Sequence, residues 1–243
     1  MSNQVWTARQ KMALRAMGFP VWERETPEVR AIEGSRDHPG GTVPAPACET
    51  ADQEHAWQAL EGEVSDCERC GLCRGRSRAV PGSGNRHAAL MLIGEAPGAE
   101  EDRHGLPFVG RAGQLLTRML AVIQIQREEV YITNTVKCRP PENRKPTPTE
   151  QAACRAYLER QIHLVSPRLL VALGGVAAQA LLQTDQTIGR LRGVIHTYRL
   201  ATLPESLPVI ATYHPAFLLR SPQYKKDARA DLDRIRAFLD GSS

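Results

Sequence analysis

The chain has 243 residues, of which 42% are hydrophobic and 24% charged, and its formal net charge is +4. This balance is ordinary for a soluble globular protein, no apolar run approaches the roughly 20 residues of a transmembrane helix, and the mild basicity is compatible with nucleic acid without proving it. The N-terminus lacks the apolar segment and cleavage site of a secretory signal, so we expect a cytoplasmic protein. Its six cysteines then favour metal ligation over a disulfide framework.

The first quarter of the chain differs in composition from the rest. Residues 1–22 contain Trp6 and Trp22 around an amphipathic pattern, which indicates either a docking helix or peptide for a protein partner or a terminus without one. Residues 23–52 are rich in Pro, Gly and charged side chains, which is typical of a flexible linker. We therefore place the globular domain at 53–243, with a flexible N-terminal extension before it.

Strand and helix patterns alternate through this domain. The expected helices are 55–64, 111–123, 149–165 with Thr149 as the N-cap, 176–182 and 225–239. The expected strands are 88–94, 130–137, 168–173, 194–200 and 208–212. Such alternation with short connections predicts an α/β fold in which helices cover both faces of a mostly parallel sheet.

The stretch Leu90–Gly113, LMLIGEAPGAEEDRHGLPFVGRAG, delivers polar residues to the end of a buried strand. Ligands bind at the carboxyl edge of open α/β sheets, and Glu95 follows the strand directly. Phe108, in a Pro/Gly setting, is placed to stack on a flat ligand. The acidic run Glu100–Asp102 is by itself most simply a solvated turn.

Two later residues also follow strand patterns. Asn134 lies in VYITNTVKC, where its amide suits recognition of an amide-bearing heterocycle, although a strand-ending turn explains it as well. His214 follows PVIATY and precedes Pro, which suits either a site residue or a packed structural histidine.

A leucine pair follows His214. If this segment is a loop, Leu218 and Leu219 are partly exposed beside Arg220, and such leucines can wedge into a nucleic-acid stack. Packing of both leucines in the core is the alternative.

The cysteines form two separated pairs. Cys67 and Cys70 are a C-x2-C pair, whereas Cys138 and Cys154 bracket a proline-rich loop. Four such thiolates can enclose a tetrahedral metal ion or an iron–sulfur cubane, and the long loop between the second pair modestly favours the cubane over a zinc knuckle. Unrelated core thiols remain the alternative, and Cys73 is spare.

Several long motifs in the same order closely resemble the family 4 uracil-DNA glycosylases, the iron–sulfur branch of the uracil-DNA glycosylase superfamily. The motifs are GEAPGAEEDRHGLPFVGRAGQLL (94–116), VYITNTVKCRPPENR (130–144) and YHPAFLLR (213–220), together with the cysteine spacing. The resemblance extends from about Asp66 to the C-terminus. It implies a three-layer α/β/α fold around a four-stranded, mostly parallel sheet, and a [4Fe–4S] cluster held by Cys67, Cys70, Cys138 and Cys154.

The resemblance also implies an activity. A monomer would flip uracil out of single- or double-stranded DNA, hydrolyse the N-glycosidic bond and leave an abasic site. No motif lysine is placed for Schiff-base chemistry, and the loop 138–154 lacks the histidine that traps the sugar in another branch, so we expect a monofunctional enzyme that turns over. An iron–sulfur DNA-binding module and a small-molecule α/β enzyme or electron carrier are the rival hypotheses.

The resemblance implies a role for each matched residue. The resemblance assigns catalysis to Glu95 and His214, and Ala96 stands where family 1 enzymes carry Asp. The implied base-binding residues are Gly94, Glu95, Ala96, Glu101 at the thymine-methyl position, Phe108, Asn134 and His214. The implied DNA contacts are Leu218 as the wedge, Leu219, Arg220, Arg111, Lys137, Arg139 and Arg144.

Overall fold

The computed structural model describes residues 51–241. These lie in the second of the two units, Met1–Val43 and Pro44–Ser243, into which the chain divides. The predicted docking peptide and nearly all of the predicted linker lie outside the described residues. Within them, no helix is long and apolar enough to cross a membrane.

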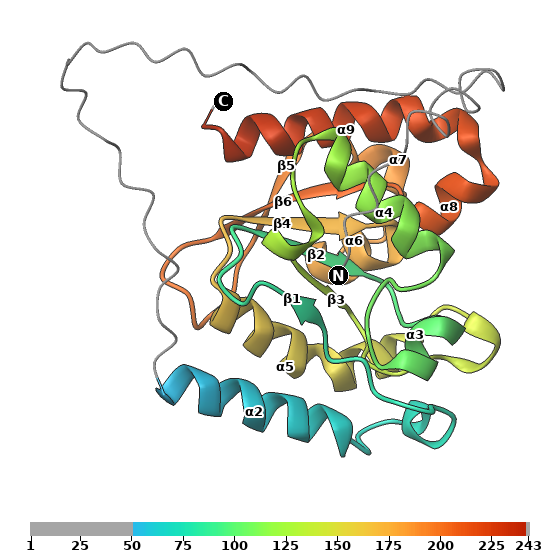
Figure 1. The fold of residues 1–243 in the computed structure, drawn as a ribbon, viewed down its shortest axis with the longest axis vertical. Helices are drawn as coiled ribbons and strands as arrows, with labels where there is room; N and C mark the ends of the chain where they lie inside the picture. Colours follow the sequence, from blue (N-terminus) through green and yellow to red (C-terminus); the bar gives the residue numbers. More distant parts are fainter. Residues whose placement is uncertain (1–50, 242–243) are drawn as a thin grey trace, which may run out of the picture. The chain divides into compact units, whose positions relative to one another are not determined.

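The described residues form helices and strands in alternation (Figure 1). The α-helices are α2 (Ala51–Ser65), α3 (Ala99–His104), α4 (Arg111–Val122), α5 (Pro148–Val165), α6 (Gly175–Leu182), α7 (Ile188–Leu191), α8 (Pro215–Arg220) and α9 (Lys225–Leu239). The short 3-10 turns are η1 (Gly71–Arg74), η2 (Arg127–Glu129), η3 (Pro141–Asn143) and η4 (Pro222–Tyr224). The strands are β1 (Ser83–Gly84), β2 (Leu90–Gly94), β3 (Tyr131–Asn134), β4 (Leu169–Leu173), β5 (Ile195–Tyr198) and β6 (Leu207–Thr212).

The strands form one mixed sheet in the order β1-β3-β2-β4-β6-β5. The four central strands are parallel, as expected, and the short antiparallel strands β1 and β5 extend the two edges. The chain passes from β2 to β3 on one side and then crosses to β4 on the other. This reversal of strand order creates a crevice at the carboxyl ends of β2 and β4.

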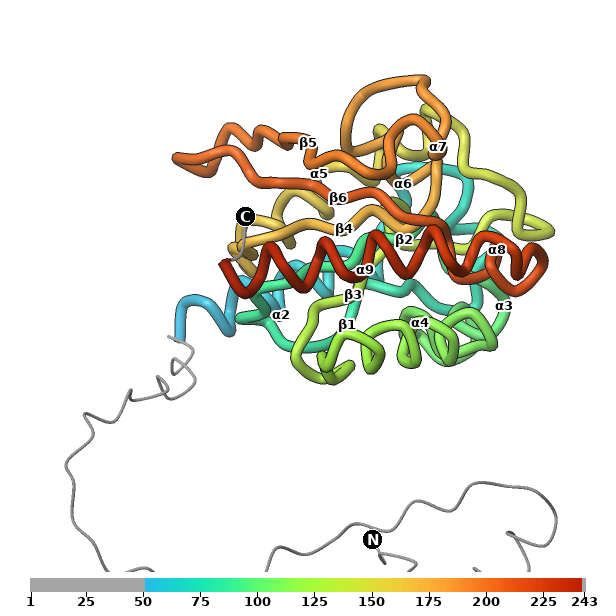
Figure 2. The backbone as a smooth tube through the Cα atoms, turned by 90° about the horizontal axis from the view of Figure 1, so that it is seen from above, coloured from blue at the N-terminus to red at the C-terminus, as the bar shows by residue number. Residues whose placement is uncertain are grey.

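Helices cover both faces of the sheet because alternate strand residues point to opposite sides. On β2, Met91 and Ile93 pack in one core with α2, α5 and α6, whereas Leu90 and Leu92 pack in the other with α4, α8 and α9. Figure 1 shows α5 and α2 below the sheet and α4 and α9 above it, and Figure 2 shows α9 lying over the strands. The predicted three-layer architecture is confirmed.

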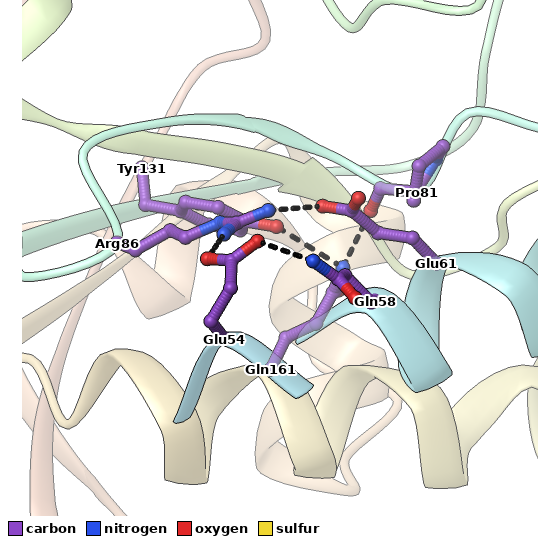
Figure 3. Close-up of polar contacts among 7 residues, drawn as sticks. All are labelled: Glu54, Gln58, Glu61, Pro81, Arg86, Tyr131 and Gln161. Carbon is purple, nitrogen blue, oxygen red and sulfur yellow. Dashed lines mark hydrogen bonds and ion pairs between the residues drawn. The ribbon is translucent and has the colours of Figure 1, made fainter. Parts of the chain in front are cut away.

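Helix α2 is joined to the sheet layer by a paired contact. Arg86 Nη1 lies 2.7 Å from Glu54 Oε2, and its Nη2 lies 3.0 Å from Glu61 Oε1 (Figure 3). The Arg86 guanidinium also lies 5.0 Å from the ring centre of the buried Trp57. This anchoring explains why the helix begins at Ala51, slightly inside the predicted linker, and not at residue 55.

Two local predictions are wrong, and the structure decides one alternative that the sequence left open. Strand β3 ends at Asn134, not at residue 137, because the chain beyond it bonds the segment that follows β2: Val136 N–H donates to Glu95 O at 3.4 Å. The N-cap of α5 is Thr147, not Thr149, since its hydroxyl accepts from Glu150 N–H while the Glu150 carboxylate accepts from Thr147 N–H. The segment after His214 is helix α8, not a loop.

Candidate active site and thiol cluster

A cavity of about 740 Å³ opens at the carboxyl edge of the sheet. Its walls come from the segments that follow the four parallel strands, together with Phe108 and part of the loop before α5. The parallel strands end at the same edge, so residues far apart in sequence meet there. Glu95, Ala96, Glu101, Phe108, Asn134, His214 and Arg220 line this cavity.

Asn134 and Gly94 are neighbours because β2 and β3 pair in register at these two positions. A Cβ on Gly94 would lie 2.3 Å from Asn134 Oδ1 and 2.8 Å from the Phe108 ring, so only glycine allows both side chains to approach this floor. Asn134 is 1% exposed, and its Oδ1 has no hydrogen-bond partner among the described residues. A buried acceptor without a donor is costly, and a ligand N–H would satisfy it.

Glu101 holds the turn that carries Phe108. Its Oε1 accepts from the N–H groups of Val109 and Gly110 at 2.9 and 3.0 Å, and its Oε2 accepts from Gly98 N–H at 3.2 Å. Phe108 itself has φ 51°, a left-handed conformation that is uncommon outside glycine. The carboxylate therefore stabilises the backbone that presents the Phe108 ring. The acidic run is not a solvated turn but the start of α3.

His214 sits at the N-cap of α8 with its ring toward Phe108, at 5.5 Å between ring centres. Its Nδ1 accepts a hydrogen bond from Ala216 N–H at 3.1 Å, so the neutral ring carries its proton on Nε2. Burial, with a smaller effect from Arg220, lowers the pKa of His214 to about 4. The side chain is therefore a neutral donor at physiological pH.

Gly174 makes room for His214. Gly174 has φ +94°, and a Cβ there would lie 2.9 Å from His214 Cβ. The glycine after β4 thus allows the histidine after β6 to come close to the neighbouring strand end.

Glu95 is half-buried at the end of β2. Its carbonyl accepts from the Thr135 hydroxyl at 2.6 Å, which fixes the backbone at this point. Burial raises the pKa of the Glu95 carboxyl, and the nearby Lys145 ammonium partly offsets this effect. A carboxyl with a raised pKa in a cavity is suited to proton transfer or to ordering a water molecule.

Two predicted DNA contacts are contradicted by burial. Leu218 is 1% exposed and packs in the core with α4 and α9, because α8 turns it inward; Leu219 is 38% exposed. Lys137 is also 1% exposed, and its ammonium is directed into the protein, where burial lowers its pKa to about 8. Neither Leu218 nor Lys137 can touch DNA as the protein is folded.

The predicted arginines have different surroundings. Arg220 is exposed at the cavity wall. Arg111 is exposed at the first turn of α4, and Arg139 Nε donates to Asn143 Oδ1 at 2.9 Å. Arg144 lines the cavity and forms a two-point ion pair with Glu150, which links it to the α5 cap. Arg111 and Arg139 are not among the residues that line the cavity.

The four predicted ligand cysteines lie around a second, smaller cavity. Cys67 and Cys70 come from the segment after α2, Cys138 from the segment after β3, and Cys154 from α5. Cys73 also lines this cavity. None of these thiols forms a disulfide. Among the described residues, no three His, Cys, Asp or Glu side chains converge on a point suited to a single metal ion.

Nitrogen donors point at the two deeper sulfurs. Arg76 Nη1 donates to Cys138 Sγ at 3.0 Å, and the backbone N–H of Lys137 donates to Cys154 Sγ at 3.3 Å. Burial raises the pKa of the Cys138 thiol to about 11 and also raises that of Cys154. A donor set of four soft thiols with N–H donors behind two of them fits an iron–sulfur cluster.

Several cavity residues did not stand out in the sequence as site residues. Gly174 follows an apolar strand pattern, and this position in a parallel sheet is a usable signal. Tyr213 directly precedes the histidine, and Lys145 lies in the loop between Cys138 and Cys154. The adjacency of Tyr213 to His214 is also a usable signal, whereas nothing in the local sequence places Lys145 at the cavity.

The chain belongs to the uracil-DNA glycosylase superfamily. A family model described as "Uracil DNA glycosylase superfamily" matches residues 81–233, which include both the cavity and Cys138 and Cys154.

Curated relatives narrow the comparison. The chain is 44% identical over 177 residues to the type-4 uracil-DNA glycosylase of Archaeoglobus fulgidus, covering 71% of this chain and 88% of the relative. It is 42% identical over 179 residues to the type-4 uracil-DNA glycosylase of Pyrobaculum aerophilum, covering 72% and 90%. It is 40% identical over 190 residues to the type-4 uracil-DNA glycosylase of Thermotoga maritima, covering 77% and 96%.

Proposed function

We propose that this protein is a uracil-DNA glycosylase that flips uracil out of DNA and hydrolyses its N-glycosidic bond, releasing uracil and leaving an abasic site. The observation that carries the proposal is the buried Asn134 Oδ1, which lacks a donor and lies beside the Phe108 ring. The superfamily match and the names of the relatives agree with it.

Asn134 supplies base discrimination. Its Oδ1 accepts from N3–H of uracil while its amide N–H₂ donates to O4. Cytosine has no N3–H and carries an amino group in place of O4, so it would leave the asparagine unpaired. Binding sites that leave a buried polar group unpaired reject the wrong ligand strongly. Phe108 stacks on the face of the base.

His214 stabilises the leaving group. As the N1–C1′ bond breaks, negative charge develops on uracil O2, and the neutral His214 donates to this oxygen from Nε2. The tautomer that the Ala216 N–H imposes is the one this role needs. Glu95, with its raised pKa, orders the attacking water or stabilises the cationic sugar.

The remaining groups position the DNA. Leu219 is the exposed leucine of α8 and takes the wedge role in place of Leu218. Arg220, together with Arg111, contacts phosphates, which orient the duplex without reading its sequence. We expect the protein to act as a monomer on the nucleoid DNA in the cytoplasm, with a protein partner that binds residues 1–22.

The thiol set would hold a [4Fe–4S] cluster through Cys67, Cys70, Cys138 and Cys154. When bound, the cluster would supply a rigid cross-link between the segment after α2, the segment after β3 and α5. The convergence of these four cysteines on one cavity supports this assignment.

Incubation of the purified protein with a uracil-containing oligonucleotide, followed by alkali, tests the proposal. We expect strand breakage at uracil and none at cytosine in the matched control strand. DNA binding without breakage would favour a non-catalytic module, whereas the absence of salt-sensitive binding would favour a small-molecule enzyme.

The proposed enzyme is monofunctional. Lys137 is buried, so its amine does not reach the sugar. We expect no protein–DNA adduct when the protein is treated with borohydride in the presence of abasic DNA. Without borohydride, we expect no adduct that survives a denaturing gel. A borohydride adduct lost on Lys145→Ala would instead assign imine chemistry to the cavity lysine.

A further inference from the structure

Lys137 has a buried position that the proposed chemistry does not use. It lies between Asn134, which faces the base cavity, and Cys138, which faces the thiol cavity. The three ammonium protons have three acceptors: Thr133 Oγ1 at 2.7 Å, the backbone carbonyl of Asn134 at 2.7 Å and Gln161 Oε1 at 2.6 Å. Each N–H of the Lys137 ammonium therefore has a hydrogen-bond acceptor.

Gln161 extends this network to helix α5. It is fully buried on α5, and while its Oε1 accepts from Lys137, its Nε2 donates to Pro81 O at 2.6 Å and to Tyr131 OH at 3.3 Å. Figure 3 shows Gln161 reaching these two partners beside the helix α2 contacts. Thr133 Oγ1 also donates to Pro81 O at 2.8 Å. The acceptors of Lys137 are thus themselves held by fixed backbone and side-chain groups.

The position of Lys137 joins two sites. Its side chain turns back onto the carbonyl at which β3 ends, while its backbone N–H donates to Cys154 Sγ. A movement of Lys137 would therefore displace both the Asn134 backbone and the donor to Cys154 Sγ. A buried hydrogen bond from a charged group is among the stronger fixed contacts in a protein.

We infer that Lys137, supported by Gln161, is a positioning residue for base discrimination: it fixes the strand end that aims the Asn134 amide and couples that amide to the thiol cavity. This inference rests on the proposed function, since it concerns how Asn134 reads the base. Lys137 touches neither substrate nor reacting atoms and acts through Asn134.

The test measures single-turnover uracil excision by Lys137→Met, which has similar length but no donors. We expect a loss of about tenfold to a hundredfold, with the iron–sulfur absorbance retained. The same substitution made in an Asn134→Ala background should cost at most about threefold more, because the amide it positions is gone. Lys226→Met, an exposed lysine of α9, is the matched control and should change nothing.

A second readout does not depend on cleavage. The unaltered protein should bind an oligonucleotide with non-cleavable 2′-fluoro-2′-deoxyuridine more tightly than one with the 2′-fluoro cytosine analogue, and Lys137→Met should reduce this ratio. Gln161→Met leaves Lys137 and the cysteines in place, so it should shift the ratio in the same direction. If Lys137→Met does not fold, the binding ratio of Gln161→Met tests the inference in its place.

Each other outcome counts against the inference. Equal losses in both backgrounds, or an unchanged base ratio in the folded variants, would show that Lys137 serves only the fold. Bleaching of the absorbance by Lys137→Met together with an unchanged ratio in Gln161→Met would assign it to the cluster alone. An unaltered protein that excises no uracil would overturn the proposed function and this inference with it.

Discussion

At the scale of single residues, the neutral His214 links the site to pH. Its pKa is about 4 in the folded chain because the ring is buried, whereas an unfolded chain has an ordinary histidine pKa near 6.5. Unfolding therefore takes up a proton between these two values. Its contribution lowers the free energy of unfolding as the pH falls from about 6.5 toward 4, by at most about 1.4 kcal/mol per pH unit, and does not change above this window.

Denaturant unfolding across this range measures the effect. A His214→Gln variant should lose that part of the acid dependence, while His163→Gln, at an exposed position on α5, should retain it. A His214→Gln profile that matches the unaltered protein would mean that the histidine titrates normally in the folded chain.

Glu101 gives a second prediction at this scale. Glu101→Ala removes the acceptors for three backbone N–H groups, so we expect the free energy of unfolding to fall by about 2 kcal/mol and uracil excision to drop at least tenfold. Glu100→Gln, exposed one residue earlier, is the control. Calorimetry and the excision assay measure both effects. If Glu101→Ala changes neither stability nor excision, Glu101 does not hold the turn that carries Phe108.

The predicted thymine exclusion by Glu101 has its own assay. If this carboxylate also blocks the methyl position, Glu101→Ala should release some thymine. No thymine release would leave the turn-holding contacts as the role of this side chain.

The candidate residues at strand ends could be predicted because their context is local. Glu95, Asn134 and His214 each follow an apolar run, and the resemblance named all three. The partners of Glu101 and the burial of Lys137 could not be predicted in this way. Both depend on which backbone groups a folded side chain meets, and no periodicity encodes that.

At the scale of elements, helix α8 separates two adjacent leucines. Leu218→Ala empties a packed core position and should lower the free energy of unfolding by about 2–5 kcal/mol. Leu219→Ala should change stability by no more than about 0.5 kcal/mol. It should instead slow excision from duplex DNA more than from single strands, because only the duplex base must leave a stack.

Thermal unfolding and excision from the two substrates separate these effects. The two variants are each other's control, since they delete the same side chain one position apart. If Leu218→Ala were the stable variant with the duplex defect, the helix would present the opposite face to DNA.

Elements with a clear pattern were predicted well, whereas helix α8 and the end of strand β3 were missed. Helix α9 has the predicted bounds, since fifteen residues give a clear periodic pattern. Helix α8 has six residues and begins at a proline, which is as typical of a loop as of a helix. The end of β3 was missed because the residues after Asn134 are buried like strand residues but bond to the neighbouring loop.

At the scale of the whole molecule, the two cavities should respond to different substitutions. Cys67→Ser should abolish the brown absorbance of an iron–sulfur cluster, whereas His214→Ala and Asn134→Asp should keep the colour and cripple excision. Cys73→Ser is the matched control, because the resemblance gives this thiol no ligand role. This variant should keep both the brown absorbance and the excision activity. Colour lost in the cavity variants would show that the two sites are assigned wrongly.

The layered architecture followed from alternation of strands and helices, so the parallel centre of the sheet was predictable. The two-residue edge strand β1 was not, because so short a segment carries too little pattern. Strand β5 was predicted within 194–200, but its antiparallel position at the sheet edge was not. The convergence of the cysteines was inferred from the resemblance, since spacing alone left zinc and unrelated thiols open.

Helix α2 has a consequence for the order of events during synthesis. It ends at Ser65, just before Cys67, and it rests on α5, which carries Cys154. The first two thiols therefore leave the ribosome long before the last, and the set of four is complete only when α5 has docked. Cluster uptake by a nascent chain would thus report that α5 has docked, and a chain stalled before α5 could not acquire the cluster.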